Sequence, residues 1–308
     1  MKTISFSEIS NLKITPQECI LWATNAIKNK NLYKLPPKTS IKFGENNFFN
    51  TMPSLIPELN MFGLKMVSRI TDRTPALKAD ILLYDLKTGE LLALLDGTWI
   101  TSWRTGAVAA ITINALSNKL NNSAYAFIGL GNTARTTLLC LEEINNHSEM
   151  NINLLAYKDQ HDNFIERFKN YKNLHFTVYN DIHKMIQESN TIISCITATN
   201  TNLADETDFQ KGTLVVPVHT RGFQNCELQF DKIYCDDIPH ISGFQNFSKY
   251  KTVIEMTDVL NNQSFHRNKD DRIIAYNIGI SIHDIYYASQ IFNKINSKES
   301  LIDEKFWV

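Results

Sequence analysis

The sequence predicts an α/β protein that combines a doubly wound parallel sheet with a second, β-rich domain. Two observations support this fold class. From residue 123 onward, short apolar segments alternate with helical ones, which is typical of a parallel sheet with covering helices. The residues before that point contain mostly strand-like stretches. The chain has 308 residues, and a prior of about 150 residues per domain also favours two domains.

A capping pattern predicts one helix near the N-terminus. Thr15 suits the N-cap, Pro16 the first helical position and Glu18 the third, and apolar residues at positions 20, 23 and 27 share one face. A Pro-Pro pair at residues 36 and 37 ends this region. Strands are predicted after it at residues 39–43, 63–68, 81–86 and 90–95, and the last two flank a Lys-Thr-Gly turn as a hairpin.

Helical and strand patterns then alternate through the rest of the chain. A long helix is predicted at residues 98–120, where it connects the two domains. Strands are predicted after it at residues 124–128, 152–157, 174–178, 191–196, 213–218 and 232–235. A final helix at about residues 280–295 is assigned to the first domain. The expected domains are therefore residues 1–115 with 282–308, and residues 116–281.

Composition argues against several functional classes. Lys and Arg total 31 and Asp and Glu total 32, with no long run of one sign, so nucleic acid is not expected as a partner. No aliphatic run exceeds five residues, whereas a membrane-spanning helix needs about 20, and the first ten residues lack the apolar segment of a signal peptide. The five cysteines form no CxxC pair and the eight histidines no HExxH motif. We therefore expect reduced thiols, a cytoplasmic location and no bound metal.

A glycine-rich loop follows the predicted strand at residues 124–128. It reads Gly129-Leu130-Gly131-Asn132-Thr133-Ala134 and leads into a helical stretch, which is the GxGxxA form of the dinucleotide fingerprint. Gly129 permits the tight turn, Gly131 lets the backbone approach a pyrophosphate, and Ala134 allows close helix packing. The helix start, with Asn132 and Thr133, offers N–H groups to the phosphates. The loop predicts an NAD(P)-binding domain, and an incidental glycine turn is the alternative.

The choice between NAD and NADP depends on the end of the next strand. A carboxylate there hydrogen-bonds the ribose hydroxyl of NAD, whereas a cation favours the phosphate of NADP. Lys158 and Asp159 occur side by side at this point. The choice is therefore open, and each residue has the alternative of being a solvated loop charge.

Several motifs precede the fingerprint. They are Gly63-Leu64-Lys65-Met66-Val67, Leu95-Asp96-Gly97 and Thr101-Ser-Trp-Arg104-Thr105-Gly106-Ala107. Together with residues 129–134, they resemble the ornithine cyclodeaminase/mu-crystallin family, which shows these motifs in this order and at about this spacing. The resemblance spans most of the chain. It implies a homodimer with a Rossmann-type domain at residues 116–281 and a β-rich substrate-binding and dimerisation domain built from the N-terminal region and the C-terminal helix.

Lys65 and Arg104 are the central candidates for the substrate site. Lys65 lies inside an otherwise apolar strand, where an unpaired ammonium is costly, so it is expected to face an anion. Arg104 lies near a predicted helix start, and its guanidinium can bind a carboxylate through bidentate hydrogen bonds. Two structural ion pairs are the alternative. The resemblance implies that both residues bind the substrate carboxylate beside the nicotinamide, with Lys65 also a candidate for proton transfer.

The resemblance implies further contacts. It places Lys38 and Met52 in the substrate site. Relatives usually carry an arginine at the position of Lys38, and a lysine cannot form bidentate hydrogen bonds with a carboxylate as an arginine does. The implied contacts with the cofactor, beyond the fingerprint and residues 158 and 159, are Thr105, Thr197, Ala198, Thr199, Asn277 and Gly279. For residues 197–199, an ordinary polar turn is the alternative.

One position departs from the family in its chemistry. The cyclodeaminases carry a catalytic aspartate in a segment that corresponds to residues 218–228, and counting back from Glu227 and Leu228 places Arg221 at that position. A permanent cation thus replaces an acidic general base. His219 and Arg221 are candidate catalytic residues, His219 as a proton donor or acceptor and Arg221 as a binder of a second acidic group. A buried structural histidine is the alternative for His219.

The preferred hypothesis is an NAD(P)-dependent oxidoreductase that acts on a small amino or imino acid, of the ketimine reductase or amino-acid dehydrogenase type. Hydride would pass between the nicotinamide and the carbon next to a carboxylate held by Lys65, Arg104 and Lys38. One alternative is an ornithine cyclodeaminase with tightly held NAD, in which Glu227 or Asp236 replaces the base. The other is a non-enzymatic NADPH-dependent binder of a small ligand, as in mu-crystallin.

Overall fold

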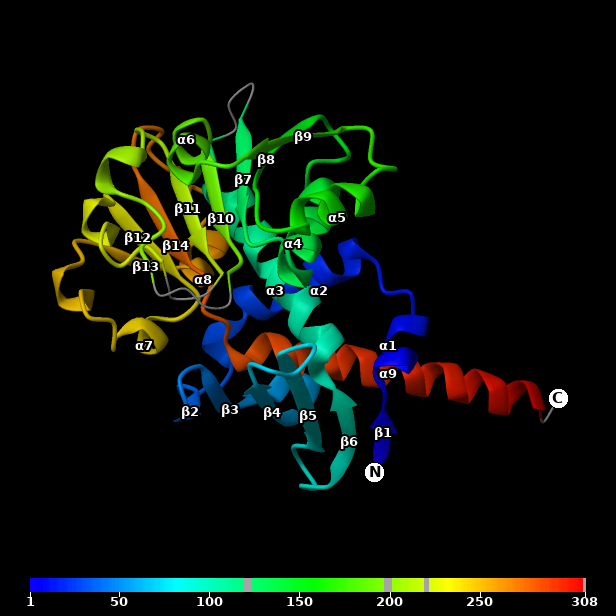
Figure 1. The fold of residues 1–308 in the computed structure, drawn as a ribbon. Coiled ribbons are helices and arrows are strands. Elements are labelled where there is room, and N and C mark those ends of the chain that lie inside the picture. Colours follow the sequence, from blue (N-terminus) through cyan, green and yellow to red (C-terminus); the bar gives the residue numbers. More distant parts are fainter. Residues whose placement is uncertain (119–122, 197–200, 219–221, 307–308) are drawn as a thin grey trace. The chain divides into compact units, whose positions relative to one another are not determined.

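The computed structural model describes residues 1–118, 123–196, 201–218 and 222–306, with side chains as far as residue 297. The chain forms two compact units (Figure 1). Unit 1 contains Met1–Arg104 with Ile280–Val308, and unit 2 contains Thr105–Gly279. The boundary falls inside helix α3 (Gly97–Leu116), whereas the boundary expected from the sequence lies near the end of that helix.

Unit 1 is built on a six-stranded sheet in the order β1-β6-β5-β4-β3-β2. β1 is parallel to β6, and the other neighbours are antiparallel. α2 starts at its predicted N-cap, because Thr15 and Glu18 form a reciprocal capping box. The elements are β1 (Lys2–Ile4), α1 (Phe6–Asn11), α2 (Pro16–Lys28), β2 (Thr39–Phe43), β3 (Asn47–Ile56), β4 (Met61–Arg69), β5 (Leu77–Asp85), β6 (Leu91–Asp96) and α9 (Ser281–Phe306).

The two faces of this sheet differ in burial. Alternate residues of β3, β4 and β5, among them Met52, Lys65 and Ile81, are buried, and helix α9 packs against these strands. A Cβ at Gly63 would lie 2.4 Å from Cδ1 of Ile285, so glycine allows α9 to approach β4 closely. Apart from the buried Ser68, the residues on the opposite face are partly buried or exposed. The sheet of unit 1 therefore has one face covered by its own chain.

Unit 2 contains an eight-stranded sheet with parallel neighbours throughout, in the order β13-β12-β14-β11-β10-β7-β8-β9. The chain runs from β7 through β8 to β9 in one direction and then through β10 and β11 in the other, which is the doubly wound arrangement. The strands are β7 (Ala124–Ile128), β8 (Met150–Leu155), β9 (Leu174–Tyr179), β10 (Thr191–Ser194), β11 (Leu214–Pro217), β12 (Lys232–Cys235), β13 (Val253–Glu255) and β14 (Ile273–Tyr276). The helices that follow α3 are α4 (Asn132–Ile144), α5 (Gln160–Arg167), α6 (Ile182–Gln187), α7 (Ile238–Ile241) and α8 (Met256–Asn261).

The predicted fold class is confirmed, with errors in single elements. The sequence patterns do not indicate β1, β3, β13 or β14. The long helix ends at Leu116 rather than residue 120, and the final helix continues to Phe306 rather than residue 295. None of the helices in the described part of the chain is long and apolar enough to cross a membrane.

Candidate functional site

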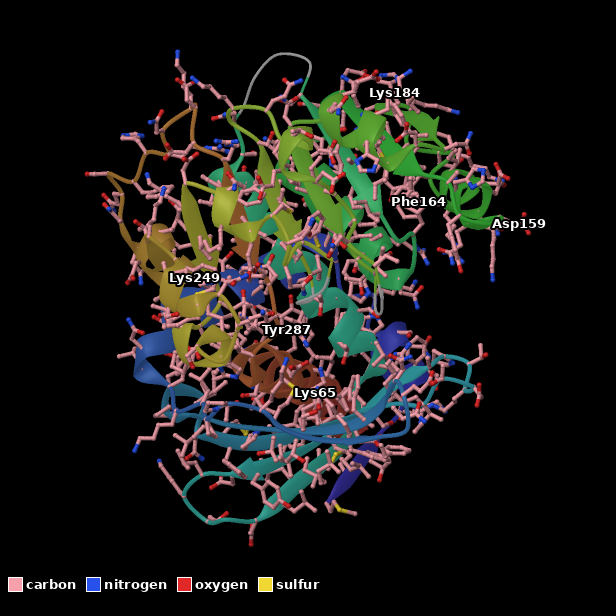
Figure 2. The ribbon with its side chains drawn as sticks, turned by 60° about the vertical axis from the view of Figure 1, so that its left-hand side comes forward. Lys65, Asp159, Phe164, Lys184, Lys249 and Tyr287 are labelled. Atoms are coloured by element: carbon pink, nitrogen blue, oxygen red, sulfur yellow. The ribbon has the colours of Figure 1, made fainter. Side chains whose placement is uncertain are left out.

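A buried cluster of charges lies in unit 1, where β4, α3 and α9 each contribute one side chain. Nζ of Lys65, labelled in Figure 2, donates a hydrogen bond to Oδ1 of Asp284 at 2.8 Å. Nε of Arg104 donates to the same oxygen at 3.0 Å. Side-chain exposure is 1% for Lys65, 8% for Arg104 and 0% for Asp284. The structure therefore brings the two predicted cations together on one carboxylate.

Burial and neighbouring charges set the protonation of this cluster. Burial alone would raise the pKa of the Asp284 carboxyl, but Arg104 and Lys65 together bring it below its ordinary value, so Asp284 is ionised at neutral pH. Burial lowers the pKa of Lys65 to about 8; Asp284 opposes this shift, and Arg104 and Lys38 add to it. Lys65 is thus charged at neutral pH. Lys38, a predicted substrate residue, acts electrostatically on it.

Part of the hydrogen-bonding capacity of the cluster remains unused. Among the residues that the structure describes, Asp284 alone pairs with the Arg104 guanidinium, through Nε, so both terminal nitrogens stay available to a ligand. Lys65 also has donors beyond the one directed at Asp284. Met52, which lies opposite Lys65 in the β3–β4 register, is buried. The cluster can therefore bind a carboxylate through charge-assisted hydrogen bonds.

Two sequence-based expectations change at this site. Arg104 was placed near a helix start, but α3 begins at Gly97 and Arg104 lies two turns further on. The helix dipole therefore gives no argument about its role. Asp284 was not predicted as a site residue. Its signal in the sequence was an acidic residue between Ile282 and Ile285, in a largely apolar stretch where a carboxylate needs a partner.

The predicted nucleotide loop lies in unit 2 between β7 and α4. Gly129 has a φ of +84°, and a Cβ there would lie 3.0 Å from the backbone that follows β10, so the position requires glycine. Gly131 is the N-cap of α4 and has no side chain to cap the helix, and no atom of the described residues beyond its chain neighbours lies within 4 Å of where its Cβ would be. Ala134 is fully buried. The first helical residues, Asn132 and Thr133, therefore start a helix whose N–H groups fit an anion such as a pyrophosphate.

A cavity of about 280 Å³ lies at the carboxyl ends of β8 and β9 in the same unit. Dinucleotides bind along this edge of a doubly wound sheet. Lys158 and Asp159 follow β8 and are exposed. Lys158 has a φ of +47°, and its Nζ lies 5.3 Å from the ring centroid of Tyr157, so its charge stays at the surface. The cavity is lined by Leu155, Ala156, Asn180, Ile182, His183, Thr201, Asn202 and Leu203.

Hydrogen bonds tie together the ends of β12 and β14. The buried Asp236 carboxylate accepts from Nδ2 of Asn277 at 3.0 Å and from the backbone N–H of Gly279 at 2.9 Å. Glu227, also buried, accepts from the Tyr276 hydroxyl and from Asn246. Both carboxylates that could replace the missing base are therefore already engaged as hydrogen-bond acceptors.

Several predicted site residues are not brought together by these contacts. Thr105 lies in α3 and is partly buried. Residues 197–199, His219 and Arg221 lie outside the described residues, so their roles stay predictions.

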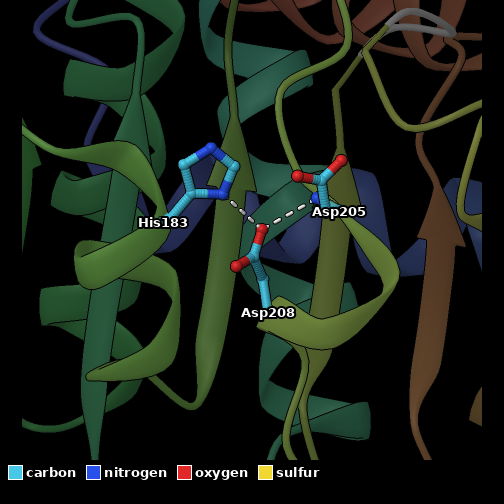
Figure 3. Close-up of side chains that lie close together, drawn as sticks. All are labelled: His183, Asp205 and Asp208. Atoms are coloured by element: carbon cyan, nitrogen blue, oxygen red, sulfur yellow. Dashed lines mark hydrogen bonds and ion pairs between the residues drawn. The ribbon is translucent and has the colours of Figure 1, made fainter.

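A further group of titratable side chains lies beside the cavity (Figure 3). Ligand atoms of His183, Asp205 and Asp208 lie within 4.8 Å of one another. One Asp208 oxygen already accepts hydrogen bonds from Nδ1 of His183 and from the backbone N–H of Asp205, each at 2.7 Å, and the other accepts from Gln187. These hydrogen bonds therefore hold the segment at Glu206–Asp208 against α6.

The chain is similar to known sequences over most of its length. Over 291 residues it is 23% identical to a Delta(1)-pyrroline-2-carboxylate reductase of Colwellia psychrerythraea, with 88% of this chain and 90% of the relative covered. It is 23% identical over 279 residues to the nodulation efficiency protein NfeD of Rhizobium meliloti, with 85% and 84% covered.

Solved structures of the same overall fold cover almost all of the chain. The Thermococcus litoralis Delta(1)-pyrroline-2-carboxylate reductase, in complex with NADH and L-proline, matches with a TM-score of 0.83 and 22% identity over 97% of this chain and 98% of that one. An archaeal alanine dehydrogenase dimer with bound NAD matches with a TM-score of 0.82 and 20% identity over 97% of both chains. The model of the ornithine cyclodeaminase/mu-crystallin family matches residues 5–299. The chain therefore belongs to the ornithine cyclodeaminase/mu-crystallin family.

Proposed function

We propose that this chain is an NAD(P)-dependent oxidoreductase that interconverts a small imino acid and the corresponding amino acid. The observation that carries the proposal is the buried cluster in which Lys65 and Arg104 share one carboxylate while Arg104 keeps its terminal nitrogens available. Such a pair suits the carboxylate of an amino or imino acid. The relatives that are named Delta(1)-pyrroline-2-carboxylate reductase support a cyclic imino acid as the substrate.

Each unit has its own task in this reaction. In unit 1, Lys65 and Arg104, with Lys38 and Met52 beside them, hold the substrate carboxylate and so fix the carbon next to it. In unit 2, the loop at residues 129–134 binds the pyrophosphate of the dinucleotide. A bound nicotinamide dinucleotide supplies or accepts hydride. Reduction of the imine adds hydride to carbon and a proton to nitrogen, and His219 is the candidate proton donor.

The cofactor is NAD or NADP. The cavity at the ends of β8 and β9 suits the adenosine half of either dinucleotide. Asp159 favours the ribose hydroxyl of NAD, and Lys158 favours the phosphate of NADP. Thr105, Asn277, Gly279 and residues 197–199 are proposed as further contacts. The solved relatives that hold NADH or NAD support a nicotinamide cofactor.

The protein is proposed to form a homodimer through the sheet face of unit 1 that α9 does not cover. Ile41, Phe43, Phe49 and Met66 share this face by strand register and are 67%, 43%, 41% and 37% exposed. Phe43 and Phe49 stack at 5.8 Å between centroids. Exposed apolar patches of this kind favour protein contacts, and the archaeal alanine dehydrogenase is described as a dimer.

Free cysteines, buried except for Cys195, are consistent with the expected cytoplasmic location.

The oligomer is tested by light scattering after size-exclusion chromatography. We expect a dimer for the wild type and a monomer for Phe49→Asp, because a charge at the centre of the patch opposes its burial. Lys211→Asp, on an exposed residue outside this sheet, is the control and stays dimeric. A monomeric wild type would remove the homodimer from the proposal.

The reaction is tested with cofactor-stripped protein and a substrate panel. Oxidation of NADH or NADPH is followed with cyclic imino acids and with 2-oxo acids paired with amines. Ornithine with catalytic NAD, assayed for ammonia, is the parallel arm for a cyclodeaminase. We expect oxidation with a cyclic imino acid and its loss in Arg104→Gln, whereas ammonia release without net cofactor use would contradict the proposal.

A further inference from the structure

The two oxygens of Asp284 have different surroundings. Oδ1 accepts from both Lys65 and Arg104, at 2.8 Å and 3.0 Å. Oδ2 is buried and has no hydrogen-bond partner among the residues that the structure describes. Because the carboxyl is ionised, Oδ2 is an acceptor only. A buried charged acceptor without a donor is costly, so this atom needs an explanation.

The neighbouring side chains do not supply that donor. His283, next in sequence, is fully buried, and neither of its ring nitrogens has a partner in the described part of the chain. Burial first, and then the charge of Arg104, lower the pKa of His283 to about 3, so it is neutral. The cluster therefore consists of two cations and one anion, with one anion oxygen left over.

A ligand with two matching groups would complete this cluster. A carboxylate meets the free donors of Lys65 and Arg104, and an N–H group meets the free oxygen of Asp284. The two oxygens of one carboxyl group lie close together, so a group bound to Oδ2 is a near neighbour of the cations held on Oδ1. An amino or imino acid carries its nitrogen one carbon away from its carboxylate, which is the spacing that this arrangement requires.

We propose that Asp284 is a substrate-binding residue that recognises nitrogen: Oδ2 accepts a hydrogen bond from the N–H group of the amino acid or of the protonated imino acid, while Oδ1 holds Lys65 and Arg104 towards the substrate carboxylate. This inference rests on the proposed role of Lys65 and Arg104. It makes Asp284 the residue that separates amino and imino acids from 2-oxo acids. A carbonyl oxygen in place of N–H would face an ionised acceptor, and sites built around a buried acceptor reject such analogues.

The test compares two non-reacting probes of nearly the same shape. Pyrrole-2-carboxylate carries an N–H group next to its carboxylate, and 2-furoate carries a ring oxygen there. Calorimetric titration of the wild type should give at least about tenfold tighter binding of pyrrole-2-carboxylate, which is what one unsatisfied buried acceptor costs. In Asp284→Asn this preference should fall to within about twofold, because the amide no longer presents a charged acceptor.

The outcomes separate this inference from the proposed function. If the wild type binds neither probe, the carboxylate site itself is wrong. If it binds both with equal affinity, the carboxylate site stands and the role of Oδ2 is overturned, whether or not Asp284→Asn folds. Asp284→Glu keeps the charge on a longer side chain, and it should retain carboxylate binding with a reduced preference.

A pH series adds a readout that a purely structural role would not change. The pKa of Lys65 is about 8 in the free protein, so binding of both probes should be strong below pH 8 and weaken as the pH rises above it. Asp284 raises the pKa of Lys65. In Asp284→Asn the weakening should therefore begin at a lower pH, and an unchanged profile would contradict the positioning of Lys65 by Asp284.

Discussion

The nucleotide loop of unit 2 and the charge cluster of unit 1 illustrate two ways of building a site. The loop is a run of six residues, Gly129–Ala134, and its task follows from backbone shape. The cluster joins residues that are 219 and 180 positions apart, and its task follows from charge. A site that depends on backbone shape can be recognised from consecutive residues in the sequence. A site made from paired charges becomes visible only when the chain has folded.

The largest expected effect separates the two regions by removing one cation. In Arg104→Gln, kcat/KM for the imino acid should fall by roughly a hundredfold, because charge-assisted hydrogen bonds to the substrate are lost. The dinucleotide affinity, measured by quenching of protein fluorescence, should stay within about twofold. Arg167→Gln, on an exposed residue of α5, is the matched control and should leave both values unchanged. An equal loss of dinucleotide affinity in Arg104→Gln would contradict the division of tasks.

The second test adds a methyl group at two glycines of the loop and leaves every charge unchanged. Gly129→Ala should lower the melting temperature and the dinucleotide affinity together, because a φ of +84° and a contact of 3.0 Å with backbone force the loop to move. Gly131→Ala should leave the melting temperature unchanged, because no other part of the chain that the structure describes lies within 4 Å of its new Cβ. It should still weaken dinucleotide binding by about tenfold, since the methyl group occupies the approach to the phosphates.

One result for these two variants would contradict the binding of pyrophosphate at the loop. If Gly131→Ala binds dinucleotide as tightly as the wild type, the pyrophosphate does not approach this residue. Probe binding to unit 1 should be unaffected in both variants.

The third test concerns the acid stability of unit 1. His283 is buried with a pKa of about 3, against an ordinary value of 6.5, so between these values the unfolded chain binds one more proton than the folded one. Stability should therefore fall as the pH decreases below 6.5, by up to about tenfold in the unfolding equilibrium per pH unit. Denaturant unfolding at pH 7, 6 and 5 measures this slope.

The control for this slope is a second histidine. His283→Asn should flatten the slope below pH 6.5, whereas His266→Asn, on an exposed residue, should leave it as in the wild type. An unchanged slope in His283→Asn would show that His283 is not held neutral by its surroundings.

The smallest expected effect concerns the choice of cofactor. Lys158→Ala should weaken NADPH binding severalfold and leave NADH binding unchanged, because only NADPH has the phosphate that pairs with a cation. Asp159→Asn should weaken NADH binding and leave NADPH binding unchanged. If neither variant changes either affinity, both side chains are solvated surface charges.

The sequence predicted unit 2 well because its signals are local. Buried parallel strands read as short apolar runs, and the fingerprint marks where β7 meets α4. The missed strands give a weaker signal because they are very short or are interrupted by polar residues. β13 and β14 have three and four residues, and β3 contains four polar residues and Pro53 among its ten. Pairing within the sheet, rather than local preference, makes these segments strands.

The sequence predicted two of the three residues in the charge cluster. The cost of burying an ammonium inside an apolar strand indicated Lys65, and the family motif indicated Arg104. Asp284 lies on the last helix, and no local pattern says which side chain it meets. The sheet register and the close approach at Gly63 bring α9 to β4, and both are tertiary features.

The central claim is tested most directly by steady-state turnover of Delta(1)-pyrroline-2-carboxylate with NADH and, separately, NADPH. We expect wild-type protein to oxidise one mole of cofactor for each mole of proline formed, and Arg104→Gln to lose this activity while still binding cofactor. Wild-type protein that binds the dinucleotide but releases ammonia from ornithine, without turning over the imino acid, would contradict the claim.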